Sequence, residues 1–297
     1  MSQLAESRTL IQKALGYRDL LRYHRGQTRD FARHDYRTFL AINRDIGKYT
    51  DMEINGLKVL DIGCGQRYPN TLLFANRPNF EAVGVDNDIV GPGISKYVKM
   101  IVKNGLERAI RSAVRETFFD PVYYSTLEKE SGGRLTKRNL KILHVDASGL
   151  PFHDNYFDAV ISNAVFEHIE NIPGVLKELN RIAKPGAIFH ILIHLYPSLS
   201  GGHNLKWAFP EKEIPNDVPP WDHLRENRYP THIYLNKFRE KDYRAFFDEY
   251  TEILEWNDGP FEGTELLTGD IRQELIEYSD EELLKRYVSV ICRPKKD

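Results

Sequence analysis

Three acidic residues each close a short apolar segment of the chain. Asp61 lies in VLDIGCGQ, Asp86 ends VGVD, and Asp146 ends ILHVD. If the segments are parallel strands, their carboxyl ends meet at one edge of a sheet, and that edge is where ligands bind. An acid there can accept ribose hydroxyls, and the third acid is placed to receive an adenine amino group. The pattern predicts an adenosine-sized crevice, with helix capping after each strand as the alternative.

A glycine turn follows the first of these acids. Gly63 and Gly65 carry no Cβ, so a ligand can approach their backbone closely. Gln66, Arg67 and Tyr68 come next, so the third glycine of the dinucleotide fingerprint is missing, and no G-K-[ST] phosphate loop is present. This disfavours a dinucleotide-dependent oxidoreductase, although the two glycines alone are also compatible with a simple turn.

Short segments rich in Val, Ile and Leu alternate with helical patterns. Near-continuous apolar runs of this length are typical of strands buried on both faces. Apolar residues at helical spacing occupy 94–118 and 172–183. The alternation predicts a doubly wound, Rossmann-like α/β fold. The expected strands are 57–63, 81–86, 140–146, 157–163, 186–196 and 286–294.

Several ordered motifs resemble those of the class I S-adenosylmethionine-dependent methyltransferases, in particular their type 11-like core. The motifs are VLDIGCGQ, VGVDND, VDASGLPFHDNYFDAVISNAVFEHI and LKELNRIAKPGAIFHI, with YVSVICRP as the last strand. The resemblance covers about 57–195 and returns at 286–294. It implies a seven-stranded sheet with the last strand antiparallel, helices on both faces, and S-adenosyl-L-methionine as cofactor.

The resemblance also implies residues for the methionine half of that cofactor. Gly63 and Gly65 would pass close to the methionine moiety, and Asp61 would reach its amino group directly or through water. Asn163, at the end of the fourth expected strand, would face the same moiety, with Glu167-His168 on the next turn.

The adenosine half is assigned in the same way. Asp86 would hold the ribose, with Asn87 beside the adenine. Asp146 and the backbone of Ala147 would read the adenine edge.

The parts outside this core are expected to recognise the methyl acceptor. We predict an N-terminal helical cap over 1–56 and a methyltransferase domain over 57–297, with insertions at about 91–139 and 197–237. The segment 91–141 is basic, with eleven Lys and Arg against five Asp and Glu. The second insertion is rich in Pro, Gly, His and aromatic residues.

Half of the ten histidines fall within 190–232, and a histidine can accept a hydroxyl proton near neutral pH. We rank His203 first as general base, His223 second and His168 third, the alternative being that they only shape the loop. His190 and His194 share one face of an expected strand, but no carboxylate cluster accompanies them, so no metal site is predicted.

Aromatic, His and Asp side chains in 197–237 suit a sugar ring, and this segment resembles methyltransferases of bacterial surface-polysaccharide synthesis. The predicted reaction is O-methylation of a sugar, glycan or sugar-nucleotide. The alternatives are a lipid-like or natural-product small molecule, or a non-catalytic cofactor-binding protein.

A net charge of −2 argues against a nucleic-acid partner. No apolar run reaches the ~18 residues of a membrane helix, and no signal core is visible, so we expect a cytoplasmic protein. The oligomeric state is not indicated.

Overall fold

The computed structural model describes residues 10–50, 56–91, 93–138, 140–208, 210–211, 214–231 and 233–296, with only the backbone of 10–24. The chain divides into two compact units: Met1–Ala41 with Gly91–Asn139, and Ile42–Val90 with Leu140–Asp297. Parts of the expected cap, 1–9 and 51–55, lie outside the described residues. The cap at 1–56 and the two insertion boundaries stay predictions.

Helices build the first unit, and the helical spacing over 94–118 is confirmed. These residues form two helices, because Gly105 takes a φ of 86° between them. The apolar residues at that spacing are largely exposed, with Val98 at 64% and Val102 at 83%. Tyr123 is fully buried instead, and its hydroxyl donates to Asp35. The helices are α1 (Leu10–Gly47), which continues into the second unit, α4 (Ser95–Asn104), α5 (Leu106–Phe118) and α6 (Asp120–Ser131).

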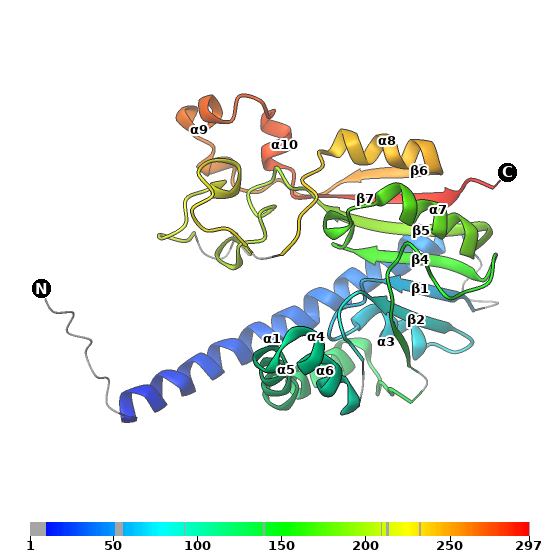
Figure 1. Cartoon of the computed structure of the whole chain (residues 1–297), viewed down its shortest axis with the longest axis horizontal. Helices are drawn as coiled ribbons and strands as arrows, with labels where there is room; N and C mark the ends of the chain where they lie inside the picture. The colour runs from blue at the N-terminus through cyan, green and yellow to red at the C-terminus, as the bar shows by residue number, and fades with distance from the viewer. Residues whose placement is uncertain are drawn as a thin grey trace, which may run out of the picture. The chain divides into compact units, whose positions relative to one another are not determined.

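A seven-stranded sheet organises the second unit (Figure 1). Its order is β3-β2-β1-β4-β5-β7-β6; β1 to β5 run parallel, and β7 runs antiparallel to both of its neighbours. The predicted doubly wound Rossmann-like sheet with an antiparallel last strand is confirmed. The strands are β1 (Lys58–Ile62), β2 (Glu81–Asp86), β3 (Lys141–His144), β4 (Phe157–Asn163), β5 (Ala183–His194), β6 (Thr251–Asp258) and β7 (Tyr287–Pro294).

Sequence reasoning missed β6. This strand lies at the edge of the sheet and pairs only with β7, so most of its residues are partly exposed. Its register shifts between Ile253 and Glu255, which interrupts the alternation that a half-buried strand would show. Without a regular period, TEILEWND gives no clear strand signal.

Helices of the second unit pack on the sheet and on one another. The predicted stripe of α7 is confirmed, since Ile172, Leu176 and Leu179 are fully buried. The Asn171 side chain accepts the Gly174 amide and so caps the start of α7. None of the described helices is both long and apolar enough to cross a membrane. The remaining helices are α3 (Pro69–Ala75), α7 (Ile172–Ile182), α8 (Glu240–Tyr250), α9 (Gly269–Glu274) and α10 (Asp280–Leu284).

The aromatic segment 197–237 is held by a small core of its own. Trp221 is fully buried, and its Nε1 donates to the carbonyl of Leu283 at 3.1 Å. Trp207 and Leu199 join this core with side chains from α9 and α10. The segment is therefore tied to the region before β7, although it contains only short helical turns.

Lys285 links three elements before β7. Its side chain is 3% exposed and pairs with Glu240 of α8, Asp258 of β6 and Glu281 of α10 at 2.7–2.9 Å.

The Lys285→Met variant should lower the free energy of unfolding by about 2 kcal/mol, because three neighbouring carboxylates lose their common partner. Urea unfolding measures this. The exposed pair of Lys206 with Asp217 provides the control: Lys206→Met should cost less than about 0.5 kcal/mol. Equal effects in the two variants would contradict the assignment.

Candidate functional site

The glycine turn after β1 is fixed by the end of β2. The amides of Gly63 and Cys64 donate to the Val85 carbonyl at 2.8 and 3.1 Å, and the Gly65 amide donates to Asp86 Oδ2 at 2.9 Å. Gly63 and Gly65 have φ values of 66° and 70°, which lie in the left-handed region. The turn therefore needs glycine at both positions, whatever it binds.

A Cβ added to each glycine would meet different surroundings. At Gly63 it would lie 2.3 Å from Cγ2 of Val165, so the segment after β4 packs directly on this residue. At Gly65 it would have no protein atom within 4 Å. Open space thus adjoins the backbone of Gly65, at the carboxyl edge of the parallel strands.

Asp61 points into the protein. It is 3% exposed, and its Oδ2 accepts the amide of Thr71 at 3.0 Å and the Thr71 hydroxyl at 2.6 Å. Burial raises the pKa of Asp61 to about 7, against the opposing effect of the Thr71 hydrogen bonds. The carboxylate caps α3, which is the alternative that the sequence left open.

Asp86 joins the ends of β1, β2 and β3. Its Oδ2 accepts from Gly65 and its Oδ1 accepts from Asp88 at 2.7 Å, while its carbonyl accepts the Val145 amide at 3.1 Å. Burial raises its pKa. Asn87, the next residue, is exposed. Three of the predicted strand ends are thus brought together around one residue, Asp86.

Asp146 and Ala147 follow β3. Asp146 is exposed, and its Oδ1 accepts the Ser148 amide at 2.7 Å and the Ser148 hydroxyl at 2.5 Å, which lowers its pKa. Ala147 is half-buried against the core. Asn163 ends β4, where it is the register partner of Leu192. All eight residues predicted for the cofactor therefore belong to strand ends or the turns after them.

Three histidine rings gather after β4 and β5. The ring of His203 lies 4.8 Å from the rings of His168 and His194. His203 has a φ of 54°, and its Nε2 lies 3.8 Å from Oε1 of Glu167. The structure thus brings together His203 and His168, two of the three predicted catalytic residues.

Glu167 was given no role by sequence reasoning. Its side chain is 1% exposed, and no side chain donates a hydrogen bond to either carboxylate oxygen; only the backbone amides of Glu167 and His194 act on it, and they favour its charged form. Burial nevertheless raises its pKa to about 8. The available signal was an acid inside the apolar run VFEHI, directly after a predicted strand.

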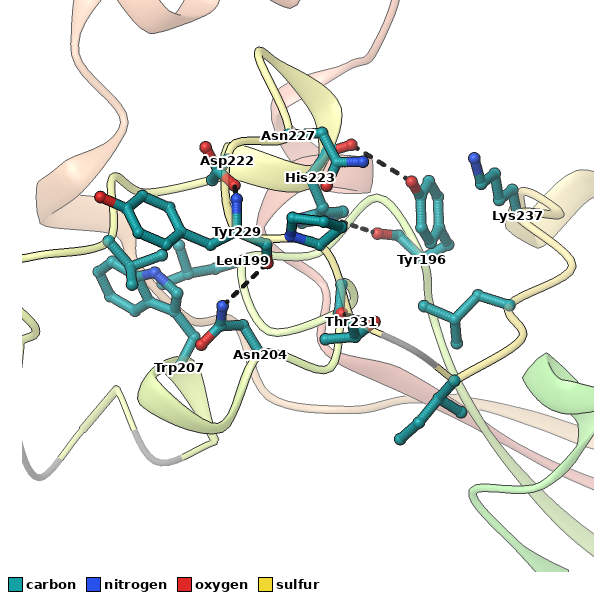
Figure 2. A pocket seen from close by; sticks show the side chains of 15 residues that line it. Tyr196, Leu199, Asn204, Trp207, Asp222, His223, Asn227, Tyr229, Thr231 and Lys237 are labelled. Atoms are coloured by element: carbon teal, nitrogen blue, oxygen red, sulfur yellow. Dashed lines mark hydrogen bonds between the residues drawn. The ribbon is translucent and has the colours of Figure 1, made fainter. Parts of the chain in front are cut away.

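His223 lies apart from the ring cluster, in the wall of a pocket (Figure 2). Its Nε2 is hydrogen-bonded to the Tyr196 carbonyl at 2.9 Å. The neighbouring Asp222 does not orient it, since that carboxylate accepts the amides of Arg228 and Tyr229. Burial lowers the pKa of His223 to about 4.

The other two histidines of β5 do not share a site. His190 pairs with Asp45, with 3.4 Å between Nε2 and Oδ2, whereas His194 Nε2 lies 2.8 Å from the Ser200 hydroxyl. His232 lies outside the described residues. His190 and His194 therefore have different partners and do not converge on a common metal position.

A family model described as a methyltransferase domain matches residues 24–250, well over half of the chain. The chain belongs to this methyltransferase family. Its methyltransferase domain is of the S-adenosyl-L-methionine-dependent class, as predicted. The open space at Gly65, edged by Asp86, fits the need of such a cofactor for close approach to the backbone.

Known proteins similar to this methyltransferase include two curated relatives. A demethylmenaquinone methyltransferase from Anoxybacillus flavithermus is 28% identical over 59% of this chain and 60% of its own length. A sterol 24-C-methyltransferase from Aspergillus fumigatus is 30% identical over 46% of this chain and 27% of its own length. The chain thus spans less than two thirds of either relative. A solved SAM-dependent methyltransferase from Methanosarcina mazei has a TM-score of 0.45 at 18% identity, covering 85% of this chain and 97% of that one.

The low pKa of His223 gives this methyltransferase a testable acid lability. Its pKa falls from 6.5 to about 4 on folding. The stability that neutral His223 contributes is therefore fully present above pH 6.5 and is lost as the pH falls toward 4. In His223→Gln, whose amide can still donate to the Tyr196 carbonyl, the loss of unfolding free energy between pH 7 and 5 should shrink by about 2 kcal/mol. Urea unfolding at both pH values measures it. Identical slopes in the variant and the natural protein would show that His223 titrates normally.

Proposed function

We propose that this methyltransferase methylates a lipid-like small molecule that carries a hydroxyl group. The observation that carries the proposal is a pocket, lined by both apolar and polar side chains, next to the Glu167, His168 and His203 cluster. The pocket has a volume of about 120 Å³. Gly202 lines it and directly precedes His203, and Leu235 and Lys237 flank Asn236, whose amide donates to the Glu167 carbonyl.

The pocket's lining suits an acceptor that has both an apolar body and a polar group. Eight of its fifteen lining residues are aliphatic or aromatic, and six carry polar or charged side chains, so the pocket offers apolar contacts together with hydrogen-bonding groups. The two curated relatives are named for demethylmenaquinone and sterol methylation, and both acceptors are lipid-like. The apolar and aromatic members are Tyr196, Leu199, Trp207, Val218, Tyr229, Pro230, Ile233 and Leu235 (Figure 2).

A sugar acceptor has less support. The tryptophans of 197–237 were expected to offer stacking faces to a sugar ring. Trp221 is instead fully buried in the small core, with its Nε1 bound to Leu283, and Trp207 is only 2% exposed. The two curated relatives described above are named for quinone and sterol methylation, not for a sugar.

For the cofactor we retain the predicted residues. Asp86 would hold the ribose with Asn87 beside the adenine, and Asp146 with Ala147 would read the adenine edge. Gly65 borders the open space that suits the methionine moiety, with Gly63 and Asn163 nearby. Asp61 would act on it mainly by fixing the turn, because its Oδ2 is occupied by Thr71.

The transfer needs little acid chemistry at the donor. The sulfonium is already a good leaving group, so the protein must hold the acceptor atom in line with the methyl carbon and make it nucleophilic. We propose that His203 and His168, with Glu167, act on the acceptor hydroxyl. The third predicted residue, His223, donates its Nε2–H to Tyr196, so its Nδ1 is left to accept a hydrogen bond from the acceptor and orient it.

Incubation with labelled methyl donor and a panel of acceptors tests this function. Isoprenoid quinols and sterols should be labelled, because each combines an apolar body with a hydroxyl group, whereas sugars and sugar-nucleotides should not. Mass spectrometry of the products identifies the methylated atom. His223→Gln should raise KM for the acceptor several-fold and change cofactor affinity little. Labelling of sugars alone would return the assignment to a glycan enzyme, and no labelling of any acceptor would favour a non-catalytic cofactor-binding protein.

A further inference from the structure

Glu167 has an environment that a structural carboxylate does not explain. It is 1% exposed, and neither of its oxygens accepts a hydrogen bond of good geometry, with only the backbone amides of Glu167 and His194 acting on it. Buried carboxylates are normally paired, hydrogen-bonded or bound to a metal, because burying an isolated charge is expensive. Two histidine rings stand beside this carboxylate.

Both rings present an imidazole nitrogen that is free to coordinate. His168 Nδ1 lies 2.8 Å from the Tyr234 carbonyl; a carbonyl can only accept, so Nδ1 carries a hydrogen and Nε2 is the nitrogen left for a metal. His203 Nε2 is buried without a partner.

We propose that Glu167, His168 and His203 bind a divalent transition-metal ion of the zinc type. One ligand atom from each residue lies within 4.8 Å of the others. The 3.8 Å between His203 Nε2 and Glu167 Oε1 is long for a hydrogen bond. It suits two ligands that each stand about 2.1 Å from one ion. Two histidines and one carboxylate leave further positions of the ion open.

The surrounding residues hold this arrangement before any ion arrives. The side-chain Nδ2 of Asn236 donates to the carbonyls of Phe166 and Ile169 at 2.8 and 2.9 Å. The backbone amide of Asn236 donates to the Glu167 carbonyl at 2.9 Å. The Tyr243 hydroxyl fixes Asn236 in turn, at 2.8 Å. Such support is typical of metal sites, where outer groups orient the ligands.

The His203 ring has a support of its own. His194 lies against it, and His194 Nε2 is bound to the Ser200 hydroxyl, which donates to Glu262 at 2.6 Å. His194 is therefore a positioning residue for His203 rather than a fourth ligand.

The role of the ion rests on the proposed function. An open position would take the acceptor hydroxyl and lower its pKa, so that the proton leaves to water. The acceptor's electron pair then forms the bond to the methyl carbon, and the electrons of the C–S bond pass to sulfur, giving S-adenosylhomocysteine. The ion is neither oxidised nor reduced.

Calorimetric titration of Zn²⁺ into chelator-treated protein tests the site, with Co²⁺ absorption as a second readout. We expect one saturable site in the natural protein and at least about thirty-fold weaker binding in Glu167→Gln and His203→Ala, since each loses one of three ligands. The exposed residues His153 and Glu226 provide controls, and His153→Ala with Glu226→Gln should bind as the natural protein does. If His203→Ala fails to fold, Glu167→Gln decides, because it keeps the size of the side chain.

Each outcome has a separate meaning. Equal Zn²⁺ affinity in Glu167→Gln, or no saturable site in the natural protein, would overturn the metal site and leave Glu167 as a neutral buried acid. Methyl transfer that survives chelation would overturn the role of the ion in catalysis while leaving the proposed function intact. Tight Zn²⁺ binding that is lost in Glu167→Gln supports the site even if no acceptor in the panel is labelled.

Discussion

The hydrogen bonds that join the glycine turn to the end of β2 are the constraint on which the cofactor site depends. Val85 and Asp86 bind the amides of Gly63, Cys64 and Gly65. Because Asp86 also accepts the amide of Val145 through its carbonyl, one short segment sets the relative positions of three loops. The parallel register of β1, β2 and β3 places these loops at one edge of the sheet. Burial of Asp61 against Thr71 then fixes α3 behind the turn.

The proposed acceptor side depends on a different feature, the buried carboxylate of Glu167, whose turn is held by hydrogen bonds. The turn containing Glu167 and His168 is bonded to Asn236, and His203 is placed by the loop that Ser200 and Glu262 anchor. The cofactor turn and the acid meet through Val165, which packs on Gly63 and lies two residues before Glu167.

Sequence reasoning reached the sheet and the strand ends proposed for the cofactor because both repeat local signals. Apolar runs mark β1, β2 and β4, and a glycine, an acid and an asparagine respectively mark where they end. It missed β6, whose bulge interrupts the alternation. Glu167 and its neighbours were out of reach for another reason: His203 and Asn236 lie 36 and 69 residues away from it, and only the fold brings them together. Periodicity describes neighbours along the chain, whereas a site of this kind depends on long-range contacts.

Calorimetric titration of S-adenosylhomocysteine into Gly65→Ala is the most direct measurement of the central claim, that the space beside the glycine turn holds the cofactor. A Cβ at Gly65 meets no protein atom, so any loss of affinity beyond backbone strain must come from the ligand. Gly132 is a matched control, because its φ is 72° and its surroundings are equally open. Gly132→Ala should bind S-adenosylhomocysteine as tightly as the natural protein does. Gly65→Ala should bind it at least about tenfold more weakly, which corresponds to a loss of about 1.4 kcal/mol in binding free energy. Unchanged affinity in Gly65→Ala, with the fold intact, would contradict the central claim.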